Sequence, residues 1–283
     1  MRRRDFLRTS AQALLASWIT AQAFANPLSR KYAASDTVTL GKTGITTSRL
    51  AMGTGTYGFG GRSQQTQMGV QGLASLLDAG YDNGLRFFDT AAGYGSHPHV
   101  AQALKSVQRD KVCVMTKDDS RDPKTMRANL DKFRKELGTD YIDIYLIHCV
   151  TEGDWTTRYR GIMDVLEEAK QKKIIRAHGV SCHSFEALQA AAASPWVEVD
   201  LARINPIGSH MDSSPDEVVP VLRQMKLQGK AVIGMKILGQ GDLRTRQDEA
   251  IKYALSLGIL DAFTIGAESR QEQQDLIRRI GAA

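Results

Sequence analysis

The feature that most constrains the fold is a regular alternation of short apolar runs with longer segments of helical periodicity. Eight such pairs follow one another from residue 50 to residue 280. Several of the short runs are continuously apolar, which is typical of strands in a sheet that is covered on both faces. A chain of 283 residues less the first 25 leaves 258, or about 32 for each of eight units, the size of one βαβ step. We therefore predict a closed parallel (β/α)8 barrel of the TIM-barrel type.

The predicted barrel domain covers residues 38–283 and begins with a short β-hairpin. The hairpin is expected over residues 38–47, where polar and apolar side chains alternate around Gly41 and Gly44. No domain boundary is evident after Asp36. The expected strands are 50–53, 86–89, 112–117, 141–148, 174–181, 199–205, 231–236 and 262–266, and the expected helices are 68–79, 100–107, 123–137, 159–172, 185–193, 215–228, 246–257 and 270–280.

The first 25 residues have the pattern of an export signal rather than of a folded element. A positive segment is followed by an apolar run over residues 11–25 that ends in Ala23-Phe24-Ala25, the small-x-small pattern of a cleavage site. This run is shorter than the roughly 20 residues needed to cross a bilayer. The sequence RRDFLR at residues 3–8 resembles a twin-arginine export signal. The alternative is a basic, amphipathic N-terminus that matches by chance.

The resemblance to an export signal implies where the protein is found. We expect residues 1–25 to be a twin-arginine signal peptide and residues 26–37 to be an N-terminal segment ahead of the barrel. The mature protein would then be a bacterial periplasmic protein, carried across the inner membrane by the twin-arginine export machinery. After cleavage no stable membrane anchor would remain.

The charge and the cysteine content exclude some functions. The formal net charge is +6, and residues 1–25, with four arginines and one aspartate, account for +3, so +3 remains for the rest. Without a stripe of Lys and Arg, this mild excess gives no case for binding nucleic acid. The three cysteines, Cys113, Cys149 and Cys182, allow at most one disulfide and a free thiol, and Cys149 and Cys182 lie at neighbouring strand ends.

Four polar residues lie at the carboxyl ends of three consecutive predicted strands. Asp89 ends the strand in RFFDTAAGY (86–94), and Tyr94 is carried on the loop that follows. Lys117 and His148 end the next two strands, 28 and then 31 residues further along, which is one βα unit each time. In a (β/α)8 barrel the chemistry lies at this end of the strands. Each residue alone has a structural explanation, as a cap, a surface ring, a snorkelling lysine or a satisfied histidine, but packing does not explain all four together.

The motifs around these residues resemble those of the aldo-keto reductases. FDTAAGYG (88–95) and LIH (146–148) match the family pattern, RAHGVS (176–181) resembles its fifth-strand signature, and the resemblance covers most of residues 38–280. It implies an oxidoreductase that reduces an aldehyde or a ketone, a small carbonyl substrate, by hydride transfer from a nicotinamide cofactor. It also assigns the four residues: Tyr94 as general acid, Lys117 to lower the pKa of Tyr94, Asp89 to pair with Lys117, and His148 to orient the substrate carbonyl.

General chemistry supports these roles. A free phenol has a pKa of about 10, and a neighbouring cation favours the phenolate and moves that pKa towards working pH. A lysine buried on its own would lose its proton, so Asp89 is expected to keep Lys117 charged. A neutral imidazole at His148 can donate a hydrogen bond to a carbonyl oxygen.

The residues expected to bind the cofactor follow the family pattern less closely. Asp200-Leu201 stands where Asn-Gln is usual, and Met235-Lys236 stands where an aromatic residue usually stacks on the nicotinamide. The loop 264–273 leads into a helix N-terminus, which suits a phosphate. Arg270 could hold the 2′-phosphate of NADPH, although Glu268 would repel it, so we expect NADPH and leave NADH open. The residues expected to bind the cofactor are Ser181 (at the position that contacts the nicotinamide amide in the family), Asn205, Lys236, Gly266, Ser269 and Arg270.

Two local patterns invite other interpretations. GTGTYG (53–58) formally matches the dinucleotide fingerprint GxGxxG, with Asp78 20 residues further on. However, no helix begins at Gly58 and Asp78 lies inside a helical segment, so a Rossmann fold is not expected. His97, where the family often has Glu, precedes Pro98 and is expected at the start of a helix.

Two other classes of function stay open at this point. A non-catalytic barrel with a vestigial nucleotide site would bind a ligand or a partner. A zinc site, or a metal-dependent hydrolase or lyase, would use His148, Cys149, Cys182 and His183 at two neighbouring strand ends. Cysteines in strands are more often buried packing residues, so no metal is expected.

Overall fold

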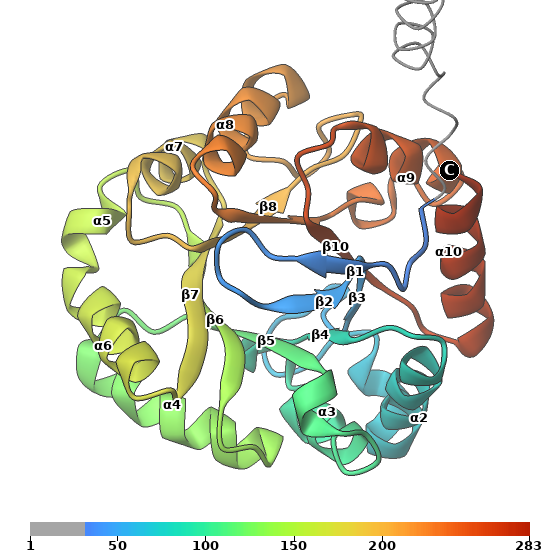
Figure 1. Cartoon of the computed structure of the whole chain (residues 1–283), viewed down its shortest axis with the longest axis horizontal. Helices are drawn as coiled ribbons and strands as arrows, with labels where there is room; N and C mark the ends of the chain where they lie inside the picture. The colour runs from blue at the N-terminus through green and yellow to red at the C-terminus, as the bar shows by residue number, and fades with distance from the viewer. Residues whose placement is uncertain (1–31) are drawn as a thin grey trace, which may run out of the picture. The chain divides into compact units, whose positions relative to one another are not determined.

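A closed barrel of eight parallel strands forms the centre of the protein, as the sequence predicts (Figure 1). The computed structural model describes residues 32–283, and Ala33–Ala283 cluster into one unit. The barrel strands are β3 (Leu50–Gly53), β4 (Phe87–Asp89), β5 (Cys113–Asp118), β6 (Ile142–Val150), β7 (Ile175–Cys182), β8 (Val199–Arg203), β9 (Ala231–Met235) and β10 (Ala262–Gly266). They follow one another around the barrel in chain order, and β10 pairs with β3 to close it.

Helices alternate with the strands and surround the barrel (Figure 1). Local sequence fixes their ends, as α4 (Pro123–Leu137) illustrates. The Asp122 carboxylate caps it by accepting a hydrogen bond from the Thr125 N–H at 2.7 Å, and Gly138 ends it in the left-handed conformation. The other helices are α2 (Gly69–Asp82), α3 (His97–Ala103), α5 (Trp155–Arg158), α6 (Arg160–Gln171), α7 (Phe185–Ala193), α8 (Pro215–Leu227), α9 (Gln247–Ser256) and α10 (Arg270–Ala282), with 3-10 turns η2 (Thr66–Met68), η3 (Ala92–Tyr94), η4 (Arg109–Lys111) and η5 (Gly239–Gly241).

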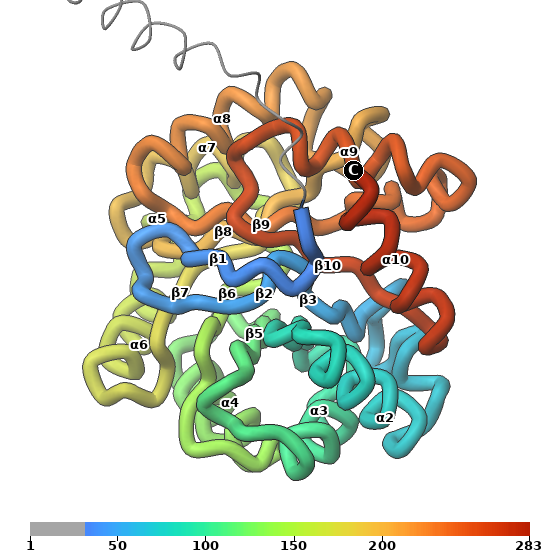
Figure 2. Tube along the Cα trace, turned by 45° about the vertical axis from the view of Figure 1, so that its right-hand side comes forward, coloured from blue at the N-terminus to red at the C-terminus, as the bar shows by residue number. Residues whose placement is uncertain are grey.

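The predicted N-terminal hairpin closes the end of the barrel where the strands begin. Strands β1 (Thr37–Thr39) and β2 (Thr46–Ser48) pair antiparallel, and both tubes cross the face of the barrel in Figure 2. The hairpin fits tightly, because a Cβ added at Gly41 would lie 2.4 Å from the backbone nitrogen of Ala231 at the start of β9. The side chains of Leu40 and Ile45 are fully buried and join the core inside the barrel.

Apolar side chains fill the inside of the barrel, so it is a packed core rather than a pore. Residues from all eight strands take part, among them Phe87, Ile144 and Ile233, each with no exposed surface. Burying one such side chain contributes about 1.5–3 kcal/mol. This core fixes the relative positions of the strand ends, and through them the polar residues that follow the strands.

The predicted elements are confirmed with small shifts and two corrections. Every barrel strand lies within two residues of its predicted ends. The helix expected at 100–107 instead spans His97–Ala103, because Pro98 occupies its first turn and the N–H and hydroxyl of Ser106 both donate to the carbonyl of Ala103, closing a turn. The short helix α5 was not predicted.

The predicted signal peptide and cleavage site lie outside the described residues. The expected segment 26–37 is described only from residue 32. Within residues 32–283, no helix is both long enough and apolar enough to cross a membrane.

Candidate active site

A buried ion pair between Lys117 and Asp89 forms the centre of the site. Asp89 ends β4 and Lys117 lies near the end of the adjacent β5, so their side chains meet, with 2.5 Å between Lys117 Nζ and Asp89 Oδ1. Lys117 Nζ also donates to the carbonyl of Thr90 at 2.8 Å, and the Thr264 hydroxyl donates to Asp89 Oδ2 at 2.8 Å. Because burying a charge is costly unless it is paired, these bonds explain how the ion pair is tolerated with Lys117 at 0% and Asp89 at 4% exposure.

Tyr94 lies directly beside this pair. It is the last residue of the turn η3, and its ring centre is 4.8 Å from Lys117 Nζ. The imidazole of His148, from β6, meets the Tyr94 ring edge to face with 5.8 Å between the ring centres. The structure therefore brings together all four residues predicted from the strand ends.

The pKa of Tyr94 is raised, whereas the sequence-based expectation was that Lys117 would lower it. Burial raises the pKa of Tyr94, and the attraction of Lys117 lowers it, but burial prevails and the pKa lies above its ordinary value of 10.0. For Lys117, burial lowers the pKa, whereas Asp89 and Tyr94 raise it by more, so its net pKa is raised and the ammonium stays charged. Tyr94 is thus a protonated phenol next to a fixed cation.

Glycines in the loop after β3 make room for the Tyr94 ring. A Cβ added at Gly55 would lie 2.2 Å from Tyr94 Cε2, and one at Gly58 would lie 2.4 Å from Tyr94 Cδ1. A Cβ at Gly53 would come within 2.9 Å of the hydroxyl of Thr264. The glycines of the formal GxGxxG match therefore serve the packing of this site, and a turn rather than a helix follows Gly58, so the Rossmann interpretation is excluded.

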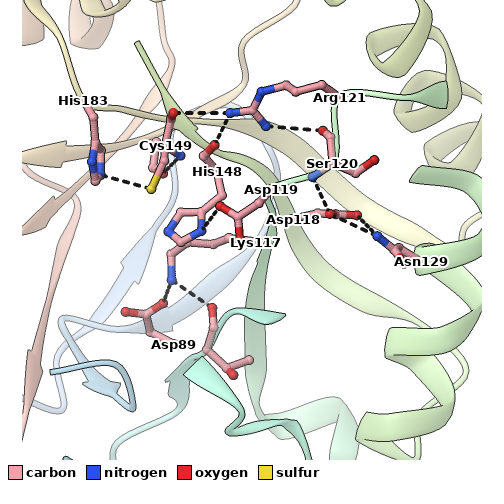
Figure 3. A network of polar contacts seen from close by, with 12 residues as sticks. Asp89, Lys117, Asp118, Asp119, Ser120, Arg121, Asn129, His148, Cys149 and His183 are labelled. Carbon is pink, nitrogen blue, oxygen red and sulfur yellow. Dashed lines mark hydrogen bonds and ion pairs between the residues drawn. The ribbon is translucent and has the colours of Figure 1, made fainter. Parts of the chain in front are cut away.

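Further polar side chains lie beside His148 (Figure 3). Asp119 Oδ1 is 3.0 Å from His148 Nδ1, and this contact holds the pKa of Asp119 below its ordinary value. Cys149 Sγ is 3.7 Å from His183 Nε2. Arg121 fixes the strand between them by donating to the carbonyl of His148 at 2.6 Å. Asp119 could not be singled out from the sequence, because one aspartate in the polar run after β5 carries no distinguishing pattern.

An open cleft of about 480 Å³ leads to Asp89 and Tyr94. Its walls come from the loops after β3 and β9 and from the end of β10. The hydroxyl of Tyr57, in the β3 loop, donates to the carbonyl of Gln240 in the β9 loop at 2.7 Å and so links the two walls. The lining includes Gly55, Thr56, Tyr57, Gln64, Lys236, Gln240, Arg244, Gln247, Thr264, Gly266, Glu268 and Glu272.

The residues expected to bind a cofactor divide into two groups. Lys236 and Gly266 line the cleft. The other four are not among its lining residues, and each has a partner elsewhere. The Ser181 hydroxyl accepts from the Cys149 N–H, Asn205 donates to the carbonyls of Ser209 and Lys236, Ser269 caps α10 by accepting from the Glu272 N–H, and Arg270 Nη2 lies 3.5 Å from the carbonyl of Ser75.

The structure also shows the surroundings of His97 and of the three cysteines. His97 begins α3 and bonds through both ring nitrogens, to Glu136 Oε2 at 2.7 Å and to the Thr116 hydroxyl at 2.8 Å, so it serves packing. All three cysteines are free thiols, and Cys182 is buried, so the bridge considered between Cys149 and Cys182 is not formed. Of the two glutamates that line the cleft, the sequence singled out Glu268 but not Glu272, which lies in the first turn of α10.

The site therefore consists of a tyrosine beside a buried lysine–aspartate pair at the strand ends of a (β/α)8 barrel. This arrangement is suited to proton transfer. The sequence profile of the Aldo/keto reductase family matches residues 51–256, and the chain belongs to that family.

Relatives and solved structures agree with this assignment. The chain is 30% identical over 167 residues to the NADH-specific methylglyoxal reductase of Escherichia coli, covering 51% of each protein. It is 29% identical over 186 residues to an aldehyde reductase of Saccharomyces cerevisiae, covering 60% of this chain and 55% of the relative. The chain thus matches about half the length of these curated relatives. An aldo-keto reductase structure from Bacillus halodurans superposes with a TM-score of 0.74 at 17% identity, over 88% of this chain and 91% of that one, and so shares the fold.

Proposed function

We propose that this protein reduces an aldehyde or a ketone with hydride from a nicotinamide cofactor, with Tyr94 as the general acid. The observation that carries the proposal is Tyr94 beside the ion pair of Lys117 and Asp89, with Asp89 and Tyr94 lining an open cleft. The relatives named as methylglyoxal and aldehyde reductases support a small carbonyl substrate.

The protein's own residues would act on the carbonyl oxygen. Tyr94 holds a proton on its phenol, and the centre of the His148 ring lies 5.8 Å from that of Tyr94, so both side chains would act on the same carbonyl oxygen as hydrogen-bond donors. Lys117 stabilises the phenolate that forms when Tyr94 gives up its proton, and Asp89 keeps Lys117 charged and in place. The bound nicotinamide would supply the hydride.

The cleft fits a dinucleotide in part. Its lining runs from Tyr94 to the N-terminal turn of α10, and glycines at 53, 55 and 266 keep the walls free of side chains. A Cβ added at Gly266 would lie 2.5 Å from the Thr56 hydroxyl, so this position has room for glycine but not for a residue with a side chain. Lys236 and Gly266 are the residues of this wall that the sequence predicted for the cofactor.

The charges at the far end of the cleft favour NADH, and we propose it as the cofactor. Glu268 and Glu272 both line the cleft, whereas Arg270, which was expected to hold a 2′-phosphate, is directed at the carbonyl of Ser75. A carboxylate accepts hydrogen bonds from ribose hydroxyls and repels a 2′-phosphate. The earlier expectation of NADPH therefore rests on a residue outside the cleft lining.

The choice of cofactor is tested with two variants. The double variant Glu268→Gln/Glu272→Gln should lower the KM for NADPH at least tenfold relative to that for NADH. Arg270→Ala is the matched control and should leave the NADH-to-NADPH ratio unchanged. Wild-type protein that prefers NADPH, together with a large loss of NADPH binding in Arg270→Ala, would restore the sequence-based expectation.

The reductase activity is tested with Tyr94→Phe, which removes one oxygen and keeps the ring against Gly55 and Gly58. General acid catalysis is typically worth about 10²–10⁴-fold, so the reduction of small aldehydes by NADH should fall by that factor. Cofactor affinity, measured by calorimetry, should barely change. A wild-type protein that reduces no carbonyl and binds no nicotinamide would favour the alternative of a ligand-binding barrel.

We also propose that the protein is exported by the twin-arginine route to the periplasm. The support is the RRDFLR sequence at residues 3–8, followed by the apolar run and the Ala23-Phe24-Ala25 site. Changing Arg3 and Arg4 to Lys should leave uncleaved precursor in the cytoplasm, and the mature periplasmic form of the wild type should begin at Asn26. An unchanged periplasmic yield from the variant would contradict the proposal.

A further inference from the structure

Four side chains with metal-binding atoms gather at one side of the site, next to Tyr94. They are Asp119, His148, Cys149 and His183, called here the mouth cluster (Figure 3). Asp119 directly follows β5, His148 and Cys149 belong to β6, and His183 directly follows β7. Three neighbouring strand ends therefore contribute to the cluster, and the proton-transfer roles of Asp89, Lys117 and Tyr94 do not account for it.

The spacing of the mouth cluster suits a small cation. The donor atoms of Asp119, His148 and Cys149 all lie within 4.8 Å of one another, with 3.0 Å between Asp119 Oδ1 and His148 Nδ1. The separation of Cys149 Sγ from His183 Nε2 is 3.7 Å. In a tetrahedral zinc site, bond lengths place two nitrogen or oxygen ligands about 3.3 Å apart and a sulfur and a nitrogen about 3.6 Å apart. The Asp119–His148 and Cys149–His183 separations are close to these values.

Asp119 and His148 supply two ligand atoms that already face each other. His148 is only 8% exposed, and its Nδ1 lies 3.0 Å from Asp119 Oδ1, a contact that lowers the pKa of Asp119. A cation bound between the two atoms would replace the proton that the imidazole and the carboxylate otherwise share. A carboxylate oxygen and an imidazole nitrogen are both ordinary ligands of zinc.

The backbone holds Cys149 in an unusual conformation. Its φ of 53° is in the left-handed region, at the irregularity where the pairing of β6 with β7 shifts. A residue with a side chain pays about 1–2 kcal/mol there, and such strain clusters at functional sites. The Ser181 hydroxyl accepts from the Cys149 N–H, and Arg121 donates to the carbonyls of His148 and Cys149, so the strained strand end is supported on both sides.

We propose that the mouth cluster is a binding site for Zn²⁺ or a similar divalent transition metal, with Asp119 Oδ1, His148 Nδ1 and Cys149 Sγ as ligands and His183 Nε2 as the fourth. The mixture of thiolate, imidazole and carboxylate selects zinc over magnesium or calcium, which prefer oxygen alone. Two anionic ligands balance the charge of a divalent ion. Asp119 is exposed, so the ion has a path of entry.

The site differs from the zinc site considered from sequence. That site paired both cysteines, but Cys182 is buried and not part of the cluster, while Asp119 was not considered. A metal on His148 would restrain the imidazole beside Tyr94, so binding should inhibit carbonyl reduction. This consequence rests on the proposed reductase function, whereas metal binding itself does not.

Cobalt titration of the full-length protein tests the site without any need for activity. Co²⁺ should bind with one-to-one stoichiometry and give the near-ultraviolet charge-transfer band of a cobalt–thiolate bond, and Zn²⁺ should displace it. Cys149→Ser should abolish the band and weaken Zn²⁺ binding by more than about 100-fold, above the 10–100-fold expected for an outer-shell partner. Cys182→Ser, which removes the neighbouring thiol, is the matched control and should keep the band.

Asp119→Asn guards against a misfolded cysteine variant, because Asp119 is exposed and its substitution should leave the fold intact. It should weaken Zn²⁺ binding at least tenfold. A wild type that gives no charge-transfer band, or a band that survives in Cys149→Ser, would overturn the proposal. If carbonyl reduction is measurable, Zn²⁺ should inhibit the wild type and a chelator should restore it. Protein that binds Zn²⁺ but reduces nothing would leave the site established and reject only the proposed reductase.

Discussion

Lys117→Met separates the stability of the site from its chemistry. Methionine keeps the length of the side chain and removes the charge, so Asp89, at 4% exposure, loses the partner of its Oδ1 while Thr264 still donates to its Oδ2. Removing one member of a buried ion pair costs about 3–5 kcal/mol, because the remaining charge is left uncompensated. The carbonyl of Thr90 also loses its donor. We therefore expect the free energy of unfolding to fall by about 3–5 kcal/mol.

The double variant Asp89→Asn/Lys117→Met removes both charges and should recover most of the lost stability. Contacting residues are coupled, so the double variant should be more stable than the sum of the single changes by about 2 kcal/mol or more. Carbonyl reduction should not recover, since the cation next to Tyr94 is absent in both variants. Urea denaturation at pH 7, followed by circular dichroism, gives the stabilities, and NADH oxidation gives the rates.

Two results would refute this account of the pair. A loss below about 1 kcal/mol in Lys117→Met would mean that Asp89 is not a buried charge dependent on Lys117. Strict additivity in the double variant would mean that the two side chains do not stabilise each other. Asp89→Asn alone serves as the control for the amide substitution.

Three further substitutions test the packing, the titration and the hydrogen bonding around the site. Gly55→Ala places a Cβ 2.2 Å from the ring of Tyr94, so reduction should fall at least tenfold while the circular dichroism spectrum is retained. Burial raises the pKa of Asp200 to about 8, so between about pH 4 and 8 the folded state holds a proton that the unfolded state has lost. The free energy of unfolding should therefore fall as the pH rises through this range, by up to about 1.4 kcal/mol per pH unit. Asp200→Asn should be indistinguishable from wild type in urea denaturation at pH 4 and more stable at pH 8. Thr264→Val removes the donor to Asp89 Oδ2 and should lower the free energy of unfolding by about 1–3 kcal/mol. A urea midpoint similar to that of wild type would contradict this prediction.

The sequence sufficed for the barrel and for the residues at its strand ends. Asp89, Lys117 and His148 are separated by about one βα unit, and parallel neighbouring strands bring such residues to one rim whatever the loops do. The apolar residues of the strands fix how the strands align in the core. This alignment in turn fixes the relative positions of the strand ends at the rim. This is why the four predicted residues meet in the structure.

The rest of the site depends on contacts that strand spacing does not encode. Thr264 is 175 residues from Asp89 in the chain and meets it only because β10 closes the barrel against β3. Glu272 reaches the cleft because the first turn of α10 faces it, and Arg270, two positions earlier on the same helix, does not. The direction of each side chain on the first turn of the helix decides which of these two residues lines the cleft. Their position next to a glycine-containing loop in the sequence does not indicate that direction.

The raised pKa of Tyr94 suits one direction of the proposed reaction. Because burial outweighs the attraction of Lys117, the pKa stays above 10.0 and the phenol is protonated throughout the physiological range. Reduction of a carbonyl needs the protonated phenol, so its rate should be flat between about pH 6 and 9. Oxidation of the alcohol needs the phenolate, whose fraction rises tenfold for each pH unit below the pKa, so its rate should rise with that slope over the same range. Steady-state rates in both directions across this range check the argument, and a reduction rate that falls through a midpoint near pH 7 would show that Lys117 outweighs burial after all.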